Sequence, residues 1–557
     1  MNQIILHKER HFLFFMSIFI SIIFISKQVD NDIWFLLSDG RYVMNYGIPS
    51  VDPLSMHDGL HFVMQQWLSA FIFWKIYSFL GETGLILLVH FIGASIIYAY
   101  YRLLLYTSDG NQSLAVLETV LLSIIPCIYF FVTRPQIFSL FIFILTILLL
   151  EKTQHSISKK QYFAFFILSC LLINLHAAMW PLILIFPLTY LAEKKYKTNY
   201  FLHQVNTSWN EYALLLLVLF VGGLLNPYGI EAMMYTFNSY GIDTINCLVG
   251  EMHPITFDNI IGKIFFILMG LLIAQYSRKK APLHFVLLSI GMTYLALSSF
   301  RSLNLFLFIG CFPLAFFFRS WKGFSFHSDS SLKVNRKFCT IIIFLIFLLY
   351  GYSFYNSKDI IQQDIKQIPI ITKAVILTII TIIISIERKY GSLKHSFIKT
   401  AIFIILLLLT LTSFNIYIQK EISLSHDPIS KRAVEYILTK ENHTNVVIWT
   451  GYNQGGYAEF RGLRPYIDTR AEVFIKANNH QKDILKEYME MIKQEITYKE
   501  LLSRYDFEYI LTTKDEIMYN YLKDDPEYEL VLEYEGKDFG KDSSVRLYKP
   551  IKRRKDE

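Results

Sequence analysis

Two acidic residues, Asp30 and Asp32, stand two positions apart at the end of the first long apolar run of the chain. A carboxylate at a membrane–water boundary can remove the proton from a hydroxyl group as that oxygen attacks. Two neighbouring carboxylates also allow one to bind a divalent metal while the other acts as the base. The alternative interpretation is a solvated helix end, and the two residues alone do not decide between these roles.

Four further ionisable residues lie beside apolar runs: Arg134, His176, Glu251 and Arg301. Ionisable groups inside membrane proteins are rare, and they are functional candidates for that reason. A guanidinium binds phosphate oxygens through paired, charge-assisted hydrogen bonds, so Arg301, and after it Arg134, is predicted to bind a phosphate. The alternatives are arginines that reach the headgroup region and a hydrogen-bonded core histidine.

The elements that position these residues are predicted from hydropathy. Hydrophobic residues make up 53% of the 557 residues and charged residues 18%, whereas soluble domains carry about 25% charged residues. This excludes a disordered chain, a fibrous repeat and a purely soluble enzyme. Apolar runs near 20 residues predict about thirteen membrane-spanning helices. They lie at 11–27, 83–106, 114–132, 136–151, 161–175, 178–192, 211–226, 260–276, 283–299, 303–318, 338–354, 369–386 and 399–418. The stretch 67–80 is predicted to form a helix along the membrane surface.

The charges of the loops predict the orientation. With the N-terminus in the cytoplasm, the basic segments 151–160, 193–199 and 277–280 all lie on the cytoplasmic side, as the positive-inside rule expects. Because the excess of lysine and arginine lies in these short loops, it is explained by membrane orientation, and nucleic-acid binding is not predicted. We therefore predict a multi-pass α-helical protein of the cell membrane, with a transmembrane domain at 1–420 and a first outer loop at 28–82 that carries the candidate catalytic aspartates. An odd number of spans makes the domain at 421–557 extracytoplasmic.

The last part of the chain has the pattern of a small α/β domain. Segments 445–450 and 507–513 predict strands, 480–503 predicts helix, and 528–535 with 544–550 predict antiparallel strands. Gly455 and Gly456 mark a turn or a point of close approach. The segment around them lacks the glycine spacing of a dinucleotide loop or a P-loop, so nucleotide binding is not predicted. Asp468 and Arg470 are expected either to contact a sugar or lipid headgroup or to form an internal salt bridge.

Short motifs follow one another along nearly the whole chain. They are Asp30-x-Asp32-x-Trp34, Gly40-Arg41, Gly47-x-Pro49, Asp52-Pro53-x-Ser55, Trp67-Leu68, Arg134-Pro135-Gln136, Asn174-Leu175-His176, Asn226-Pro227-Tyr228-Gly229, Glu251-Met252-His253-Pro254, and Arg301 with Asn304. In this order they resemble bacterial multispan glycosyltransferases of the GT-C superfamily, which includes protein O-mannosyltransferases and lipid A aminoarabinose transferases.

The resemblance implies an integral membrane glycosyltransferase with a catalytic aspartate in its first outer loop. The expected donor is a polyprenyl-phosphate sugar, and the expected acceptor is an extracytoplasmic glycan, lipid or protein, with inversion at the sugar and with membrane lipid around the spans. Asp30 or Asp32 is then the base, Arg301, Arg134 and His176 bind the donor phosphate, and Glu251, His253 and Trp34 contact substrate. The alternatives are a transporter or flippase for a lipid-linked glycan and a polysaccharide polymerase.

The need for a metal is left open. Leu36 stands where many of these enzymes have a histidine after the tryptophan, which weakens the argument for a metal in the first outer loop. His57 and His61 are four residues apart but have no set of ligands near them in the sequence, so no metal site is predicted there. No cofactor is otherwise expected, and a divalent metal remains an alternative.

Overall fold

The computed structural model describes residues 24–25, 29–196, 200–203, 205–239, 243–320, 429–441, 445–538 and 541–551. All of them belong to one compact unit, formed by Met1–Ser325 and Lys420–Glu557. The predicted spans at 338–354, 369–386 and 399–418 lie outside the described residues, as does nearly all of the span at 11–27. The predicted domain boundary at 420 also lies outside them and stays a prediction.

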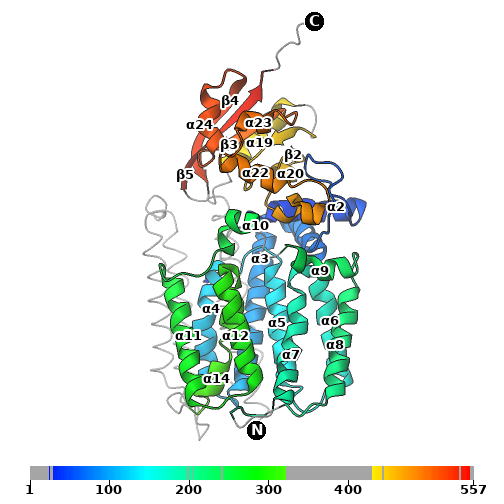
Figure 1. Ribbon diagram of the computed structural model, residues 1–557, viewed down its shortest axis with the longest axis vertical. Coiled ribbons are helices and arrows are strands. Elements are labelled where there is room, and N and C mark those ends of the chain that lie inside the picture. Colours follow the sequence, from blue (N-terminus) through cyan, green and yellow to red (C-terminus); the bar gives the residue numbers. More distant parts are fainter. Residues whose placement is uncertain are drawn as a thin grey trace, which may run out of the picture. The chain divides into compact units, whose positions relative to one another are not determined.

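The described residues up to 320 are mainly helical (Figure 1). The α-helices are α2 (Ile33–Tyr46), α3 (Trp67–Thr107), α4 (Gln112–Tyr129), α5 (Gln136–Glu151), α6 (Lys159–Leu175), α7 (Pro181–Lys195), α8 (Trp209–Leu224), α9 (Ile230–Ser239), α10 (Asp243–Leu248), α11 (Ile260–Arg278), α12 (Leu283–Ser298), α13 (Leu303–Leu305) and α14 (Pro313–Phe318). Short 3₁₀ turns η1 (Ala177–Met179), η2 (Gly250–Met252) and η3 (Phe300–Ser302) and a π-helical turn η4 (Phe306–Gly310) link some of them.

Helices occupy every predicted span from 83–106 to 303–318. Among the described residues, three helical segments are long and apolar enough to cross a membrane: Trp67–Thr107, Ile260–Arg278 and Phe300–Phe318. Several other apolar helices are shorter than that. The predicted total of about thirteen spans is therefore not confirmed, although the largely helical fold is.

Helix α3 contains both the predicted surface helix at 67–80 and the predicted span at 83–106. The two parts meet at Gly81, whose φ of 60° and ψ of −155° interrupt the helix. Glycine adopts such positive φ values at little cost because it has no Cβ. The break between the two predicted helices is confirmed, and the position of 67–80 along a membrane surface stays a prediction.

Helices α6 and α8 pack closely because α8 presents small residues to its neighbours. A Cβ at Gly222 would lie 2.9 Å from the Cβ of Ser169, and one at Gly223 would lie 2.2 Å from a ring carbon of Trp180. Small residues of this kind let helix backbones approach one another in membranes. Ser158 begins α6 with a capping box, which satisfies backbone N–H groups that the first turn leaves free. This packing fixes the end of α6, where His176 follows.

The C-terminal part is a mixed sheet with helices, as predicted (Figure 1). The strand order is β2-β1-β3-β5-β4, with β1 parallel to β2 and β3, and β5 antiparallel to β3 and β4. The strands are β1 (Val447–Trp449), β2 (Arg464–Pro465), β3 (Tyr509–Thr513), β4 (Tyr528–Asp538) and β5 (Lys541–Pro550). The helices are α19 (Ile429–Lys440), α20 (Gly455–Phe460), α21 (Lys476–Asn479), α22 (Ile484–Ile492), α23 (Tyr498–Leu502) and α24 (Ile517–Tyr521), with 3₁₀ turns η7 (Ala471–Phe474) and η8 (Leu522–Asp524).

Gly455 begins helix α20, so the alternative of a turn at this position was wrong. The alternative of a close approach is confirmed, because a Cβ on Gly455 would lie 2.0 Å from the carbonyl oxygen of Ile467. On Gly456, a Cβ would lie 3.5 Å from the backbone nitrogen of Phe35. Gly455 is thus required for the packing of α20 against its own domain, whereas a side chain at Gly456 would make only an ordinary contact with α2.

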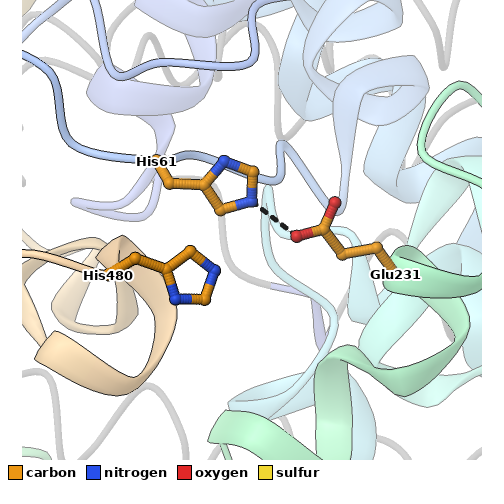
Figure 2. A group of neighbouring side chains, drawn as sticks. All are labelled: His61, Glu231 and His480. Carbon is orange, nitrogen blue, oxygen red and sulfur yellow. Dashed lines mark hydrogen bonds and ion pairs between the residues drawn. The ribbon is translucent and has the colours of Figure 1, made fainter.

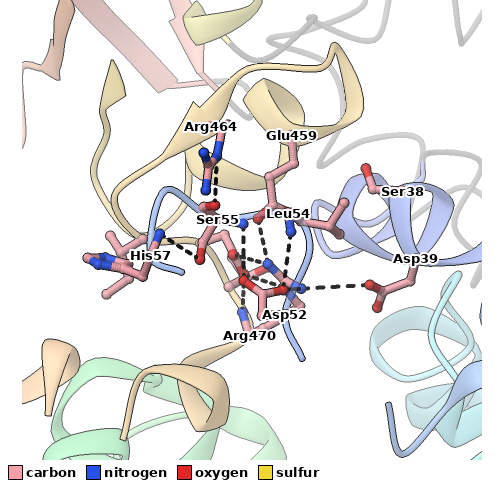
Figure 3. A network of polar contacts seen from close by, with 12 residues as sticks. Ser38, Asp39, Asp52, Leu54, Ser55, His57, Glu459, Arg464 and Arg470 are labelled. Carbon is pink, nitrogen blue, oxygen red and sulfur yellow. Dashed lines mark hydrogen bonds and ion pairs between the residues drawn. The ribbon is translucent and has the colours of Figure 1, made fainter. Parts of the chain in front are cut away.

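A buried ionic cluster joins the first outer loop to the C-terminal part (Figure 3). The guanidinium of Arg470, 3% exposed, lies 2.8 Å from Asp52, 2.7 Å from Asp468 and 2.6 Å from Glu459. It also lies 3.7 Å from Asp39 of α2, and burial raises the pKa of Asp39 to about 8 although Arg470 opposes this. Of the two roles expected for Asp468 and Arg470, the internal salt bridge is the one observed.

Candidate functional site

The segment before α2 holds Asp30 and Asp32 in different ways. The backbone N–H of Asp30 donates to Thr133 Oγ1 at 2.9 Å, and its carbonyl accepts the N–H of Ile33 at 3.1 Å. Its carboxylate accepts the N–H of Asp32 at 3.0 Å. Asp32 stands at the N-cap position, but its side chain makes no capping hydrogen bond. The interpretation as a helix-end residue therefore fits Asp30 better than Asp32.

Arg134, in the turn before α5, faces both carboxylates. Its Nε lies 2.7 Å from Asp30 Oδ1 and 3.1 Å from Asp32 Oδ2, and its Nη1 lies 2.7 Å from Glu251 Oε2. Only 16% of the Arg134 side chain is exposed. One guanidinium thus joins carboxylates from two separate segments, as expected for charges that would otherwise repel one another at close range.

Glu251 links this group to Arg301. Its Oε2, which accepts from Arg134, also lies 3.3 Å from the Nε of Arg301. The Ser299 hydroxyl donates to the carbonyl of Glu251 at 3.0 Å, so η2 and η3 are fixed side by side. One third of the Arg301 side chain remains exposed. The side chain of Arg301 is therefore more accessible to solvent than that of Arg134.

The surroundings give the carboxylates different proton affinities. Burial raises the pKa of Asp32 to about 6, although 20% of its side chain is exposed. The positive charge of Arg134 opposes this rise, and the negative charge of Asp30 adds to it. Burial also acts on Glu251, but the charges of Arg134 and Arg301 outweigh it and hold its pKa below the ordinary value. A general base works best with a pKa near the working pH. Of these two groups, Asp32 is the better suited to exchange a proton near neutral pH.

The structure brings together five of the eight predicted site residues: Asp30, Asp32, Arg134, Glu251 and Arg301. His176 is 6% exposed, and its Nδ1 lies 2.8 Å from the hydroxyl of Ser139. Burial, aided by the charge of Arg301, lowers the pKa of His176 to about 3, so its ring is neutral. Its surroundings match the alternative of a core histidine, and its role at a phosphate stays a prediction.

Trp34 and His253 lie differently from the other candidates. Trp34 is 4% exposed, and its ring centroid lies 5.1 Å from those of Tyr457 and Phe460 in α20. His253 is exposed, and its carbonyl accepts the backbone N–H of Phe300 at 2.9 Å. Their contacts position α2 and η3, and the substrate roles of both residues stay predictions.

The C-terminal part also reaches this site, which the sequence did not indicate. The side-chain amide of Asn31 donates to the carbonyl of Asn453 at 2.8 Å. Burial, and after it the nearby charge of Asp32, raises the pKa of Tyr452 well above its ordinary value. The Tyr452 hydroxyl donates to the carbonyl of Thr469 at 2.9 Å. A tyrosine in a glycine-rich segment carries no sequence signal that would assign it to a site more than 400 residues away.

Two groups of side chains among the described residues bear on cation binding. At Asp30 and Asp32 the positive charge that faces both carboxylates is Arg134, so a metal ion there would share its ligands with a guanidinium. The second group is His61, Glu231 and His480, which lie together although they are far apart in sequence (Figure 2).

Comparison with known proteins supports the fold. No protein-family model matches the chain, and no curated protein sequence matches it either. The fold is similar to that of the archaeal oligosaccharyltransferase AglB from Archaeoglobus fulgidus, solved with an inhibitory peptide and a dolichol-phosphate, with a TM-score of 0.50 and 10% identity over 90% of this chain and 69% of that one. The Archaeoglobus fulgidus oligosaccharyltransferase tethered to an acceptor peptide gives a TM-score of 0.47 and 11% identity over the same shares. At 10% identity this similarity is one of fold, and it agrees with the fold that the resemblance to the GT-C superfamily implied.

Proposed function

We propose that this protein is an integral membrane glycosyltransferase that moves a sugar from a polyprenyl-phosphate donor to an extracytoplasmic acceptor with inversion. The observation that carries the proposal is the cluster in which Asp32, with a pKa of about 6, lies beside Arg134 and near the partly exposed Arg301. The GT-C fold supports it, because the site residues belong to the motifs that carry the resemblance.

In the proposed reaction Asp32 is the general base. At pH 7 a carboxyl group with a pKa of about 6 is mostly ionised and still accepts a proton readily. The acceptor hydroxyl gives its proton to Asp32 while its oxygen bonds to the anomeric carbon. The bond from that carbon to the phosphate oxygen breaks, and the lipid phosphate leaves with the electron pair. A single displacement of this kind inverts the configuration at the anomeric carbon.

The two arginines have different tasks in this proposal. Arg134 already faces three carboxylates, so its charge mainly keeps Asp30, Asp32 and Glu251 together. Arg301 pairs with Glu251 at the longer distance of 3.3 Å and is one-third exposed. It would stabilise the negative charge that develops on the leaving phosphate, as preorganised donors do in other transfer reactions. Glu251 orients both guanidinium groups.

A transporter or flippase receives less support. Such a protein needs polar side chains along a path that crosses the membrane between its helices. The buried ionic group formed by His284, Glu193 and Glu151 lies instead at the ends of helices. His284, at the start of α12, lies 2.6 Å from Glu193 near the end of α7 and 3.0 Å from Glu151, the last residue of α5. These contacts tie three helix ends together.

Reconstitution into proteoliposomes tests the proposal. Radiolabelled sugar on a defined polyprenyl phosphate should pass to an added glycan, lipid or peptide acceptor, and the released lipid should carry a single phosphate. A nucleotide sugar without lipid should not serve as donor. Movement of the labelled lipid between leaflets without any transfer would contradict the proposal and favour the flippase.

A further inference from the structure

We propose that His61, Glu231 and His480 form a binding site for one divalent transition-metal ion of the Zn²⁺ type. His61 comes from the first outer loop, Glu231 from the first turn of α9, and His480 from the residue after α21. One ligand atom from each side chain lies within 4.8 Å of the other two. Figure 2 shows the three side chains turned toward one another. This site goes beyond the proposed transfer reaction and does not depend on it.

The chemistry of the three groups suits zinc. Imidazole nitrogen and carboxylate oxygen are its common ligands, and two histidines with one glutamate form a known zinc ligand set. Ligand atoms around a tetrahedral ion with bonds of about 2.1 Å stand roughly 3.4 Å apart. His61 Nε2 and Glu231 Oε1 are 2.5 Å apart, which is closer than this, and all three ligand atoms lie within 4.8 Å of one another. Side-chain rotations that separate His61 from Glu231 would be needed for all three groups to bond to one ion.

Backbone hydrogen bonds keep the segments that carry His61 and His480 side by side. The N–H of His61 donates to the carbonyl of Asn479 at 3.2 Å, so the segments of His61 and His480 are hydrogen-bonded directly. The Asn479 side chain donates to the carbonyls of Val473 and Lys482 at 3.0 Å and 2.8 Å. The two imidazole rings lie parallel to within 23°, with centroids 4.9 Å apart. The backbone therefore keeps the segments that carry His61 and His480 next to each other.

A cavity of about 50 Å³ adjoins the three ligands and is also lined by Asn238, Glu472 and Asn478. Three protein ligands leave one position of a tetrahedral zinc site open for water or another small ligand. The cavity supplies room for such a ligand. The His61 and Glu231 side chains are 30% and 43% exposed, so an ion can enter from solvent. A bound ion would tie the first outer loop, α9 and the C-terminal part together.

The test uses the full-length protein in detergent, stripped with a chelator and titrated with Zn²⁺ by calorimetry. We expect one equivalent to bind, and His480→Ala and His61→Ala to weaken binding by about a hundredfold or more, at least the loss seen when outer-shell partners are removed. His155→Ala is the matched control, because that exposed histidine contacts Asn206 instead. Asp32→Asn should also retain binding, which separates this site from the first-loop carboxylates.

Glu231→Gln keeps the size of the side chain but removes its charge. Zn²⁺ binding by this variant therefore still tests the site if a histidine variant fails to fold. With Co²⁺ in place of Zn²⁺, the wild type should show the visible absorption of a tetrahedral ion, and Glu231→Gln should reduce it. Equal Zn²⁺ binding by the wild type and all three ligand variants would overturn the site, as would the absence of any stoichiometric binding.

Discussion

Arg134 is the residue whose replacement tests the electrostatics of the candidate site, because it faces both first-loop carboxylates. Its Nε lies 3.1 Å from Asp32, and at an effective dielectric constant of about 20 this pair attracts by roughly 5 kcal/mol. Water and neighbouring charges compensate for much of that loss, and an adjacent arginine typically lowers an aspartate pKa by about 1–3 units. Arg134→Gln should therefore raise the pKa of Asp32 from about 6 to roughly 7–9.

The assay is the pH dependence of kcat/KM for sugar transfer between pH 5 and pH 10. The ionised fraction of Asp32 at pH 7 would fall from about nine-tenths to between about one-half and one-hundredth. The rate at pH 7 should fall by roughly 2- to 100-fold and recover at higher pH. Arg319→Gln, which removes an arginine paired with Asp109 at 3.2 Å, is the matched control and should leave the profile unchanged. An unchanged acidic limb in a folded Arg134→Gln protein would refute the proposed coupling.

Three other predictions address the donor, the loop contact and the orientation. Arg301→Ala should raise the KM for the lipid donor at least about tenfold, and Arg301→Lys should restore only part of this, since lysine lacks the paired fork; unchanged donor kinetics would remove Arg301 from the site. Burial raises the pKa of Asp39 from 3.8 to about 8. Between about pH 4 and 8 the folded state therefore binds this proton more tightly than the unfolded state does, and the free energy of unfolding falls as the pH rises. Asp39→Asn should flatten the fall in Tm between pH 5 and 8, and an unaltered slope would contradict that assignment. Protease added outside right-side-out vesicles should digest the domain at 421–557, whereas protection of that domain would contradict the predicted topology.

Much of the helical part could be predicted because hydropathy decides it locally. Charges next to apolar runs are few, so Asp30, Arg134, Glu251 and Arg301 stood out as candidates before their contacts were known. The sequence could not show that Arg134 faces both aspartates and Glu251, since those distances depend on how separate helices pack. It also could not choose between Asp30 and Asp32, because that choice depends on burial and on the hydrogen bonds that Asp30 accepts.

Contacts between the first outer loop and the C-terminal part account for most of what was missed. The packing of Trp34 on α20 was not foreseen, because this contact joins two segments with no shared periodicity, and its role at the substrate stays a prediction. His57 and His61 were considered as a pair, yet the ring of His57 hydrogen-bonds to the carbonyl of Tyr466 at 2.9 Å while His61 meets Glu231 and His480. Strand β2 has two residues, too few to give an alternating pattern. Only the tertiary fold brings such residues together.

The most direct test of the central claim is the turnover of three single variants in the first outer loop, each shown to insert and fold. Asp32→Asn keeps the size of the side chain but removes the proton acceptor, so transfer should fall about a hundredfold or more. Asp30→Asn should lose less, because Asp30 mainly holds the Asp32 backbone and Arg134. Asp58→Asn, at a surface residue 89% exposed in the same loop, is the matched control and should keep wild-type turnover. Wild-type turnover in Asp32→Asn would contradict the assignment of Asp32 as the general base.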